Sequence, residues 1–338
     1  MMPPAHTAEE LSRRPLGPLE RLQRRLHATP AIAPAMVLAL AVATFSLVSP
    51  RFASPVSLSL VFQQVSVIGA LAAGQTLIIL TAGIDLSVGA ITILSMMVMA
   101  TLAHQGVPAP LALLAGLLLG VGAGALNGLL VTRAKLPPFI ATLGTLGVFT
   151  ALALLYSGGQ SIPEGQLPPL LNRLGATFPA GPFRITLGVV LVLAIYAVLN
   201  FVLTQTAWGT HVYAVGDDAE ASRLAGIRVG AVLLSVYVVA GLIDGLAAWV
   251  LIGRAGAASP NAIAEANLES ITAVVIGGVS LFGGRGSLVG TLLGALIVGV
   301  FRSGLSFARV DDQYRVMAVG ILVILAVSVD QWIRKVRA

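Results

Sequence analysis

The chain of 338 residues carries few charges for its length, with 14 Asp and Glu against 20 Lys and Arg and a formal net charge of +6. Hydrophobic residues make up 57% of it and charged residues 10%, which is too little polar surface for a soluble globule of this size. The sequence has no cysteine and only four scattered histidines, so we predict neither disulfides nor a metal site. The composition indicates an integral membrane protein. Most of the basic excess flanks apolar segments, which favours membrane orientation over nucleic-acid binding as its cause.

Apolar stretches of about 20 residues recur along the chain, the length that a helix needs to cross a hydrocarbon layer of roughly 30 Å. They lack the alternation of barrel strands. We therefore predict an all-α polytopic membrane protein with about ten transmembrane helices, one or two of them short or broken. The predicted segments are 31–49, 57–80, 88–104, 110–131, 138–156, 184–204, 230–252, 267–282, 287–307 and 314–332. The eighth is short and interrupted by glycine, so we do not expect it to cross fully as a regular helix.

The basic residues predict the orientation of the chain, because positively charged loops stay in the cytoplasm. An even number of spans puts both termini on one side, and most Lys and Arg residues then fall on that side, so we expect both termini to be cytoplasmic. Residues 1–30, rich in Pro and Arg, are predicted to be a disordered cytoplasmic tail. Residues 31–333 would form the transmembrane domain and 334–338 a basic cytoplasmic tail. The long outward loop 156–184 is a candidate docking surface.

One carboxylate, Asp85, lies between two long apolar segments, where a charge is expensive and marks a pathway, a partner or a turn. The preceding glycine and the hydroxyl of Ser87 favour a tight turn whose carboxylate caps the next helix at Ser87 and Val88. We take that turn as the main interpretation and a direct substrate contact as the second. The other candidates for a translocation path or a structural turn are Gln75, Asn127, Asp244 and Glu269.

Neutral amides and hydroxyls in these segments suit an uncharged, polyhydroxylated substrate, but they also serve to bridge helices. For Asp244 we favour hydrogen bonds to neighbouring helix backbones or hydroxyls over a place in a pathway, and for Glu269 we favour a helix cap.

Glycines spaced four residues apart predict close helix packing, because small residues let two backbones approach in lipid. The fourth and ninth predicted segments carry this pattern. The candidate packing residues are Gly116, Gly120, Gly124 and Gly128 in the fourth, and Gly286, Gly290 and Gly294 in the ninth.

The chain shows no nucleotide site of its own. A phosphate-binding loop needs Gly-Lys-Ser/Thr, whereas the two lysines, Lys135 and Lys335, follow Ala134 and Arg334. The glycine string at 276–287 lies between apolar segments with no strand before it, which argues against a dinucleotide fingerprint. We therefore expect no cofactor and no enzymatic activity in this chain.

The segment 206–230 predicts a short amphipathic helix from about Asp218 to Ala225. Asp217 and Glu220 have capping-box spacing, and Gly226 is placed to end the helix. Ala221, Leu224 and Ala225 share one side, which forms a small apolar face for the chain's own helices or for a partner protein.

Four strings in the sequence are typical of one known family: GIDLSVG (83–89), LPPFIATLGT (136–145), YAVGDDAEASRLAGI (213–227) and AVVIGGVSLFGGRGS (273–287). From about Val61 to its C-terminus the chain resembles the membrane permeases of bacterial ABC importers for monosaccharides, of the ribose and fructose type. The resemblance implies a multi-pass protein of the bacterial inner membrane.

The partners that the resemblance implies are a second permease copy, a cytoplasmic ATPase that binds ATP and Mg, and a periplasmic sugar-binding protein, all in a lipid membrane. It also implies that the segment at about 206–229 couples the permease to the ATPase. The residues that it assigns to this coupling are Gly216, Asp217, Glu220, Ala221, Arg223, Leu224, Gly226 and Ile227. Two alternatives remain: an ABC permease for branched-chain amino acids, and a proton-coupled secondary carrier that uses Asp85 and Asp244.

Overall fold

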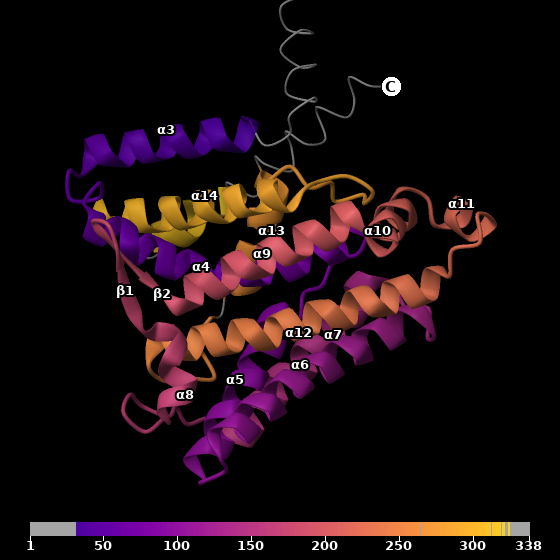
Figure 1. Ribbon diagram of the computed structural model, residues 1–338, viewed down its shortest axis with the longest axis horizontal. Coiled ribbons are helices and arrows are strands. Elements are labelled where there is room, and N and C mark those ends of the chain that lie inside the picture. Colours follow the sequence, from indigo (N-terminus) through magenta and orange to yellow (C-terminus); the bar gives the residue numbers. More distant parts are fainter. Residues whose placement is uncertain (1–31, 264, 312, 319, 322–323, 325–338) are drawn as a thin grey trace, which may run out of the picture.

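The computed structural model describes residues 32–263, 265–311, 313–318, 320–321 and 324, and most of them are helical (Figure 1). The predicted tails 1–30 and 334–338, and most of the last predicted segment 314–332, lie outside the described residues. The assignments made for those segments stay predictions.

The described chain contains helices, one short 3-10 turn and one β-hairpin. In chain order they are α3 (Ile32–Val48), α4 (Pro55–Leu80), α5 (Val88–His104), α6 (Ala109–Thr132), α7 (Pro138–Ser157), α8 (Pro169–Asn172), η1 (Arg173–Gly175), β1 (Thr177–Ala180), β2 (Phe183–Thr186), α9 (Leu187–Gln205), α10 (Ala207–Asp217), α11 (Ala219–Leu224), α12 (Val229–Ala255), α13 (Ala266–Ile276) and α14 (Leu288–Phe307).

Six of the described helices are long and apolar enough to cross a membrane: α4, α6, α7, α9, α12 and α14. Three shorter apolar helices, α3, α5 and α13, accompany them. These findings support a polytopic membrane protein. The count of about ten spans and the cytoplasmic placement of both termini stay predictions.

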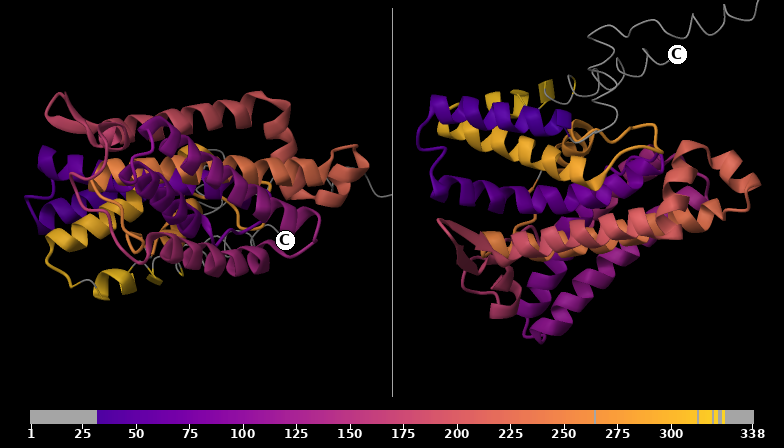
Figure 2. Two further views of the ribbon diagram at one scale, coloured as in Figure 1. Left: turned by 90° about the horizontal axis from the view of Figure 1, so that it is seen from below. Right: turned by 45° about the horizontal axis from the view of Figure 1, so that its top comes forward.

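Helix α4 is the centre of the fold. It packs against α12, α14, α13 and α9, and every residue from Val65 to Leu80 is buried. Figures 1 and 2 show α4, α9, α12 and α14 running side by side, with α3 outside α14 and with α5, α6 and α7 on the opposite side of α12. The short helix α11 lies at one end of these helices and the β-hairpin at the other (Figure 1). We call these the α11 end and the hairpin end.

The β-hairpin is an element that the all-α prediction did not include, although the described chain is mostly helical. Strands β1 and β2 pair antiparallel, with Thr177 opposite Thr186 and Ala180 opposite Phe183. The predicted sixth segment was to begin at residue 184, but β2 runs to Thr186 and α9 begins at Leu187. Thr186 fixes this boundary, because its extended backbone ends the strand while its side chain accepts a hydrogen bond from the Val189 N–H.

The four glycines of α6 lie where the helix meets its neighbours most closely. A Cβ at Gly120 would overlap the Gly241 carbonyl oxygen of α12, and one at Gly124 would overlap the Tyr237 carbonyl oxygen. Gly116 lies in the same way against Met99 of α5. Gly128 lies against Leu234 and Tyr237 of α12. The backbones of α6 and α12 therefore touch along one continuous glycine face.

The glycine pattern of the ninth segment is only partly helical. Gly290 and Gly294 of α14 contact the backbone of α13 at Gly277 and Ala273. Gly286 lies before α14, which begins at Leu288, and packs against Val279. The prediction that Gly286 belongs to this helix was wrong. Its φ of +141° is incompatible with a right-handed helix.

Helix α13 is too short to cross a membrane. Its 11 residues end at Ile276, and Gly277 begins an irregular segment that continues to Ser287. At 1.5 Å per residue the helix spans roughly 16 Å, about half of a hydrocarbon layer. The predicted eighth segment, 267–282, was therefore too long as a helix, but the expectation that it is short and interrupted by glycine agrees with the structure.

The glycine face predicts that Gly124→Ala lowers the stability of the protein by about 1–3 kcal/mol, because the added methyl group forces the backbones of α6 and α12 apart. Thermal unfolding of the purified protein in detergent measures this change. Gly122→Ala is the matched control, since a Cβ at Gly122 meets nothing within 4 Å. Equal melting temperatures for the two variants would contradict the account.

Candidate functional site

A tight turn joins α4 to α5 and carries Asp85. The Gly83 N–H donates to the Ile78 carbonyl (3.0 Å) and the Ala82 N–H donates to the Ile79 carbonyl (2.9 Å), which closes the end of α4. Ala82 has a φ of +59°, the left-handed conformation that this type of helix end requires. The turn places Asp85 inside the protein, with 2% of its surface exposed.

The Asp85 carboxylate is held by hydrogen-bond donors on both sides. Its Oδ1 accepts from the Ser87 N–H and from the Ser87 hydroxyl, both at 2.6 Å. Its Oδ2 accepts from Nδ2 of Asn127 at 3.3 Å. These hydrogen bonds reach Ser87 and not Val88, so the carboxylate stabilises the turn before α5 more than the first turn of the helix. Such donors offset the cost of burying the charge.

The network around Asp85 extends to three further helices. Asn127 of α6 donates to the Ser87 hydroxyl at 2.8 Å, and the hydroxyl of Thr145 on α7 donates to Asn127 Oδ1 at 2.8 Å. Oriented with its amino group toward the Asp85 carbonyl, the Gln75 amide of α4 hydrogen-bonds the Asp85 backbone at both its carbonyl (3.2 Å) and its N–H (3.3 Å). Gln75, Asp85, Ser87 and Asn127 therefore form one buried cluster.

Within the part of the chain that the structure describes, the side chains of Asp244 and Glu269, the other two candidates, make no hydrogen bond to this network. Asp244 of α12 is buried, and its backbone carbonyl accepts from the Thr92 hydroxyl at 3.3 Å. Among the described residues, Asp244 Oδ1 makes no hydrogen bond. Glu269 of α13 pairs instead with Arg302 of α14. The six candidates thus occupy three places, and only the first is a connected cluster.

Helix α11 is the predicted amphipathic helix, with one correction at its start. Its N-cap is Asp218, whose Oδ1 accepts from the Glu220 and Ala221 N–H groups, both at 2.9 Å. Asp217 was predicted to form a capping box with Glu220, but Asp217 is the last residue of α10. Since the extended backbone needed for a cap begins only at Asp218, that residue takes the role.

The end and the outer face of α11 follow the prediction. Gly226 has a φ of +87°, and the Ile227 N–H donates back to the Ser222 carbonyl at 3.0 Å. Leu224 is 90% exposed, an unusual exposure for a large apolar side chain. Glu220 and Arg223 form an exposed ion pair of 2.7 Å, which adds little stability.

Three backbone segments meet where α10 ends. A Cβ at Gly216 would overlap the Leu80 carbonyl oxygen at the end of α4, and that oxygen accepts from the Gly284 N–H at 2.9 Å. Gly283 contacts the Gly216 carbonyl oxygen and Ala82. We call this contact of Leu80, Gly216, Gly283 and Gly284 the glycine junction. It connects α10, and through it α11, to the turn before α5 and to the segment 277–287.

A half-buried phenol reinforces the glycine junction. The Tyr213 hydroxyl of α10 donates to the Gly286 carbonyl at 3.0 Å. Burial raises the pKa of the Tyr213 hydroxyl above its ordinary value, so this donor keeps its proton at neutral pH. Sequence reasoning singled out Gly216 but missed Gly283 and Gly284. The feature that could have identified them is the glycine pair in the string LFGGRG, because glycine readily adopts the left-handed conformation that both residues have in the structure.

Comparisons with known proteins identify a family for this chain. The family model described as "Branched-chain amino acid transport system / permease component" matches residues 57–327. The chain is 48% identical over 325 residues to the fructose import permease protein FrcC of Rhizobium meliloti, which covers 95% of this chain and 90% of that protein.

Two further relatives also match along nearly the whole chain. The ribose import permease protein RbsC of Bacillus subtilis is 36% identical, covering 93% of this chain and 97% of that protein. The D-allose transport system permease protein AlsC of Escherichia coli is 37% identical, covering 88% and 91%. No solved structure matches the chain.

The Asp85 network predicts that Asn127→Ala destabilises the protein by about 1–3 kcal/mol, because the buried carboxylate and the Thr145 hydroxyl lose their partner. Thermal unfolding in detergent measures the loss. Gln205→Ala, which removes an exposed amide at the end of α9, is the control and should leave the melting temperature unchanged. A stable Asn127→Ala variant would show that water replaces the amide and that the network is not structural.

Proposed function

The chain belongs to the family of branched-chain amino acid transport system permease components, and we propose that it is the membrane subunit of an ABC importer for a monosaccharide of the fructose or ribose type. The observation that carries this proposal is its 48% identity to a fructose import permease over 95% of the chain. The names of the ribose and allose permeases point to the same class of substrate. The protein is a multi-pass protein of the bacterial inner membrane.

A separate ATPase supplies the energy in this proposal. The sequence contains no phosphate-binding loop, so ATP and Mg belong to a cytoplasmic partner. The exposed face of α11 suits the docking of that partner, because Leu224 is 90% exposed at the α11 end and does not pack on the chain's own helices. Gly216 then links the docking helix to α4 through the glycine junction.

The other proposed partners are a second copy of the permease and a periplasmic sugar-binding protein. Large apolar side chains of α3, α6, α7 and α9 are exposed in the single chain, which suits contact with lipid and with a second copy. The hairpin end, which includes the loop 156–184, lies opposite α11 and is the surface on which we place the binding protein (Figure 1).

A branched-chain amino acid is the second candidate substrate, because the family description names it. The three relatives described above are permeases for sugars, which favours the monosaccharide. A proton-coupled carrier is less well supported, since the Asp85 carboxylate is engaged with Ser87 and Asn127 in a structural turn.

Reconstitution in proteoliposomes tests the proposal. With the cognate ATPase and binding protein, uptake of D-fructose or D-ribose should require ATP, and a proton gradient alone should drive none. Leu224→Asp should abolish uptake and weaken co-purification of the ATPase, because it places a charge in the docking face.

The control for this experiment is Gln105→Asp, which adds the same charge at an exposed turn after α5 and should keep both activities. Uptake driven by a proton gradient without the partners would overturn the proposal. Normal ATPase binding by Leu224→Asp would overturn only the docking role of α11, and the proposed transport function would stand.

A further inference from the structure

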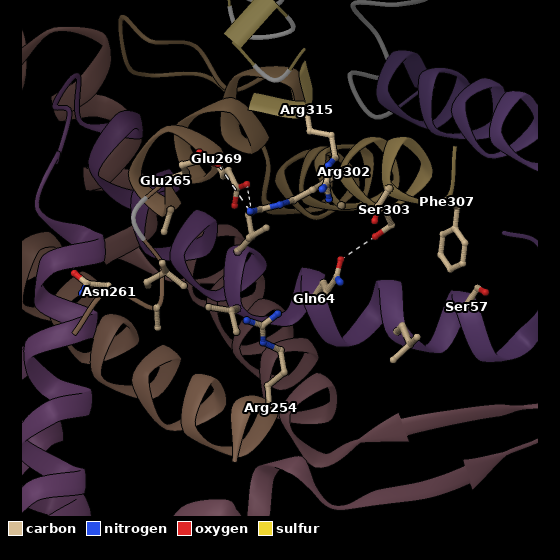
Figure 3. Close-up of a pocket in the computed structure, with 18 residues that line it drawn as sticks. Ser57, Gln64, Arg254, Asn261, Glu265, Glu269, Arg302, Ser303, Phe307 and Arg315 are labelled. Atoms are coloured by element: carbon tan, nitrogen blue, oxygen red, sulfur yellow. Dashed lines mark hydrogen bonds and ion pairs between the residues drawn. The ribbon is translucent and has the colours of Figure 1, made fainter. Parts of the chain in front are cut away.

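A polar cavity opens between α4, the end of α12, α13 and α14, away from the Asp85 network (Figure 3). Its volume is about 580 Å³, within the range of about 300–1,000 Å³ that is typical of small-molecule sites. Ser57, Gln64 and Phe307 line it, together with the segment before α13. Ser57 lies in the first turn of α4, next to the hairpin end, so the cavity belongs to the half of the molecule that is remote from α11.

The cavity concentrates charges that are costly inside a membrane protein. Arg302 of α14 pairs with Glu269 of α13, and its second nitrogen lies 3.8 Å from Glu265. Glu269 is buried, whereas the Arg302 side chain is 41% exposed. Figure 3 shows the Arg302 guanidinium directed at the two carboxylates, with Arg254 approaching the cavity from α12.

Neutral polar groups complete the lining. The Ser303 hydroxyl of α14 donates to Gln64 Oε1 of α4 at 2.8 Å, which leaves the Gln64 amino group directed at the cavity side (Figure 3). Gln64 is exposed although it lies in the middle of a helix whose next turns are wholly buried. Asn261 contributes another amide from the segment between α12 and α13.

The backbone around the cavity supports a functional site. Residues 256–265 are not helical where the structure describes them, and α13 begins only at Ala266. The N–H and carbonyl of Ala258 pair with Ile162 of the loop 156–184, so this segment lies at the hairpin end of the cavity. Its irregular backbone brings the Asn261 amide to the cavity wall.

We propose, on the basis of the function proposed above, that this cavity binds the monosaccharide during its passage through the permease. Carboxylates accept hydrogen bonds, guanidinium groups donate them, and amides do both. A sugar hydroxyl also does both, so each hydroxyl finds a partner in this wall. The Phe307 ring offers an apolar surface for the C–H face of the sugar ring. The ion pair of Glu269 and Arg302 holds α13 to α14. When the sugar binds, the two side chains give up part of their bonding to each other and hydrogen-bond the sugar hydroxyls instead.

Cysteine protection tests the site, since the natural chain contains no cysteine. Asn261→Cys and Ser306→Cys place thiols at exposed positions in the cavity wall. In the assembled transporter, D-fructose or D-ribose should slow their reaction with a charged methanethiosulfonate reagent. Gln105→Cys, at the exposed turn after α5, is the control and should react at the same rate with and without sugar.

A second variant tests the role of the ion pair. Glu269→Gln, added to Asn261→Cys, should raise the sugar concentration for half-protection about tenfold, the effect of losing one charge-assisted hydrogen bond. Co-purification of the ATPase should remain unchanged, which shows that the variant is folded.

Three results would overturn the proposal. They are no reaction at either cavity thiol, a reaction that is not slowed by a sugar that the transporter carries, and equal slowing at Gln105→Cys. Slowing by anionic lipid instead of sugar would assign the cavity to a lipid headgroup and also overturn it. If the complete transporter carries neither sugar, the proposed function itself fails, and this outcome is distinct from failed protection.

Discussion

Close contact between helix backbones is the constraint on which the rest of this structure depends. In a bilayer, apolar side chains gain little free energy by moving from lipid into a contact between helices, so helices associate through packing and hydrogen bonds. Here α6 meets α12 at Gly120 and Gly124, and α13 meets α14 at Gly290 and Gly294. These contacts hold α12, α13 and α14 around the buried helix α4. The helices in turn position the polar side chains that they carry.

The same kind of contact connects the proposed ATPase-docking helix with the proposed sugar cavity. At the glycine junction, Gly216 of α10 touches Leu80 and Gly284. Gly284 belongs to the segment 277–287, which follows α13 directly, and α13 carries Glu269 into the cavity. If the ATPase docks on α11 as proposed, a displacement of α11 would have a short route to the ion pair of Glu269 and Arg302. The Asp85 turn, whose Ala82 contacts Gly283 of the junction, adjoins this route on the side of α5.

The sequence predicted much of this architecture because long apolar runs and glycine spacing are local signals. The bounds of α4, α5, α6, α7 and α14 agree with the predicted segments within two residues. The prediction failed where contacts across the fold decide the structure. Gly286 fits the spacing of a helix but adopts a positive φ, and Asp217 fits a capping box although α10 continues through it. The pairing of Glu269 with Arg302 joins residues 33 apart in the chain, which spacing does not show.

The most direct test of this account is the number of sugar molecules taken up per ATP hydrolysed by the reconstituted transporter carrying Gly216→Ala. The added Cβ would displace the end of α10 from Leu80, whereas Gly230→Ala adds the same group with its nearest neighbour 4.0 Å away. We expect Gly216→Ala to bind and hydrolyse ATP with its partner but to take up less sugar per ATP than Gly230→Ala. An unchanged ratio would contradict the claim that the glycine junction transmits the movement of α11.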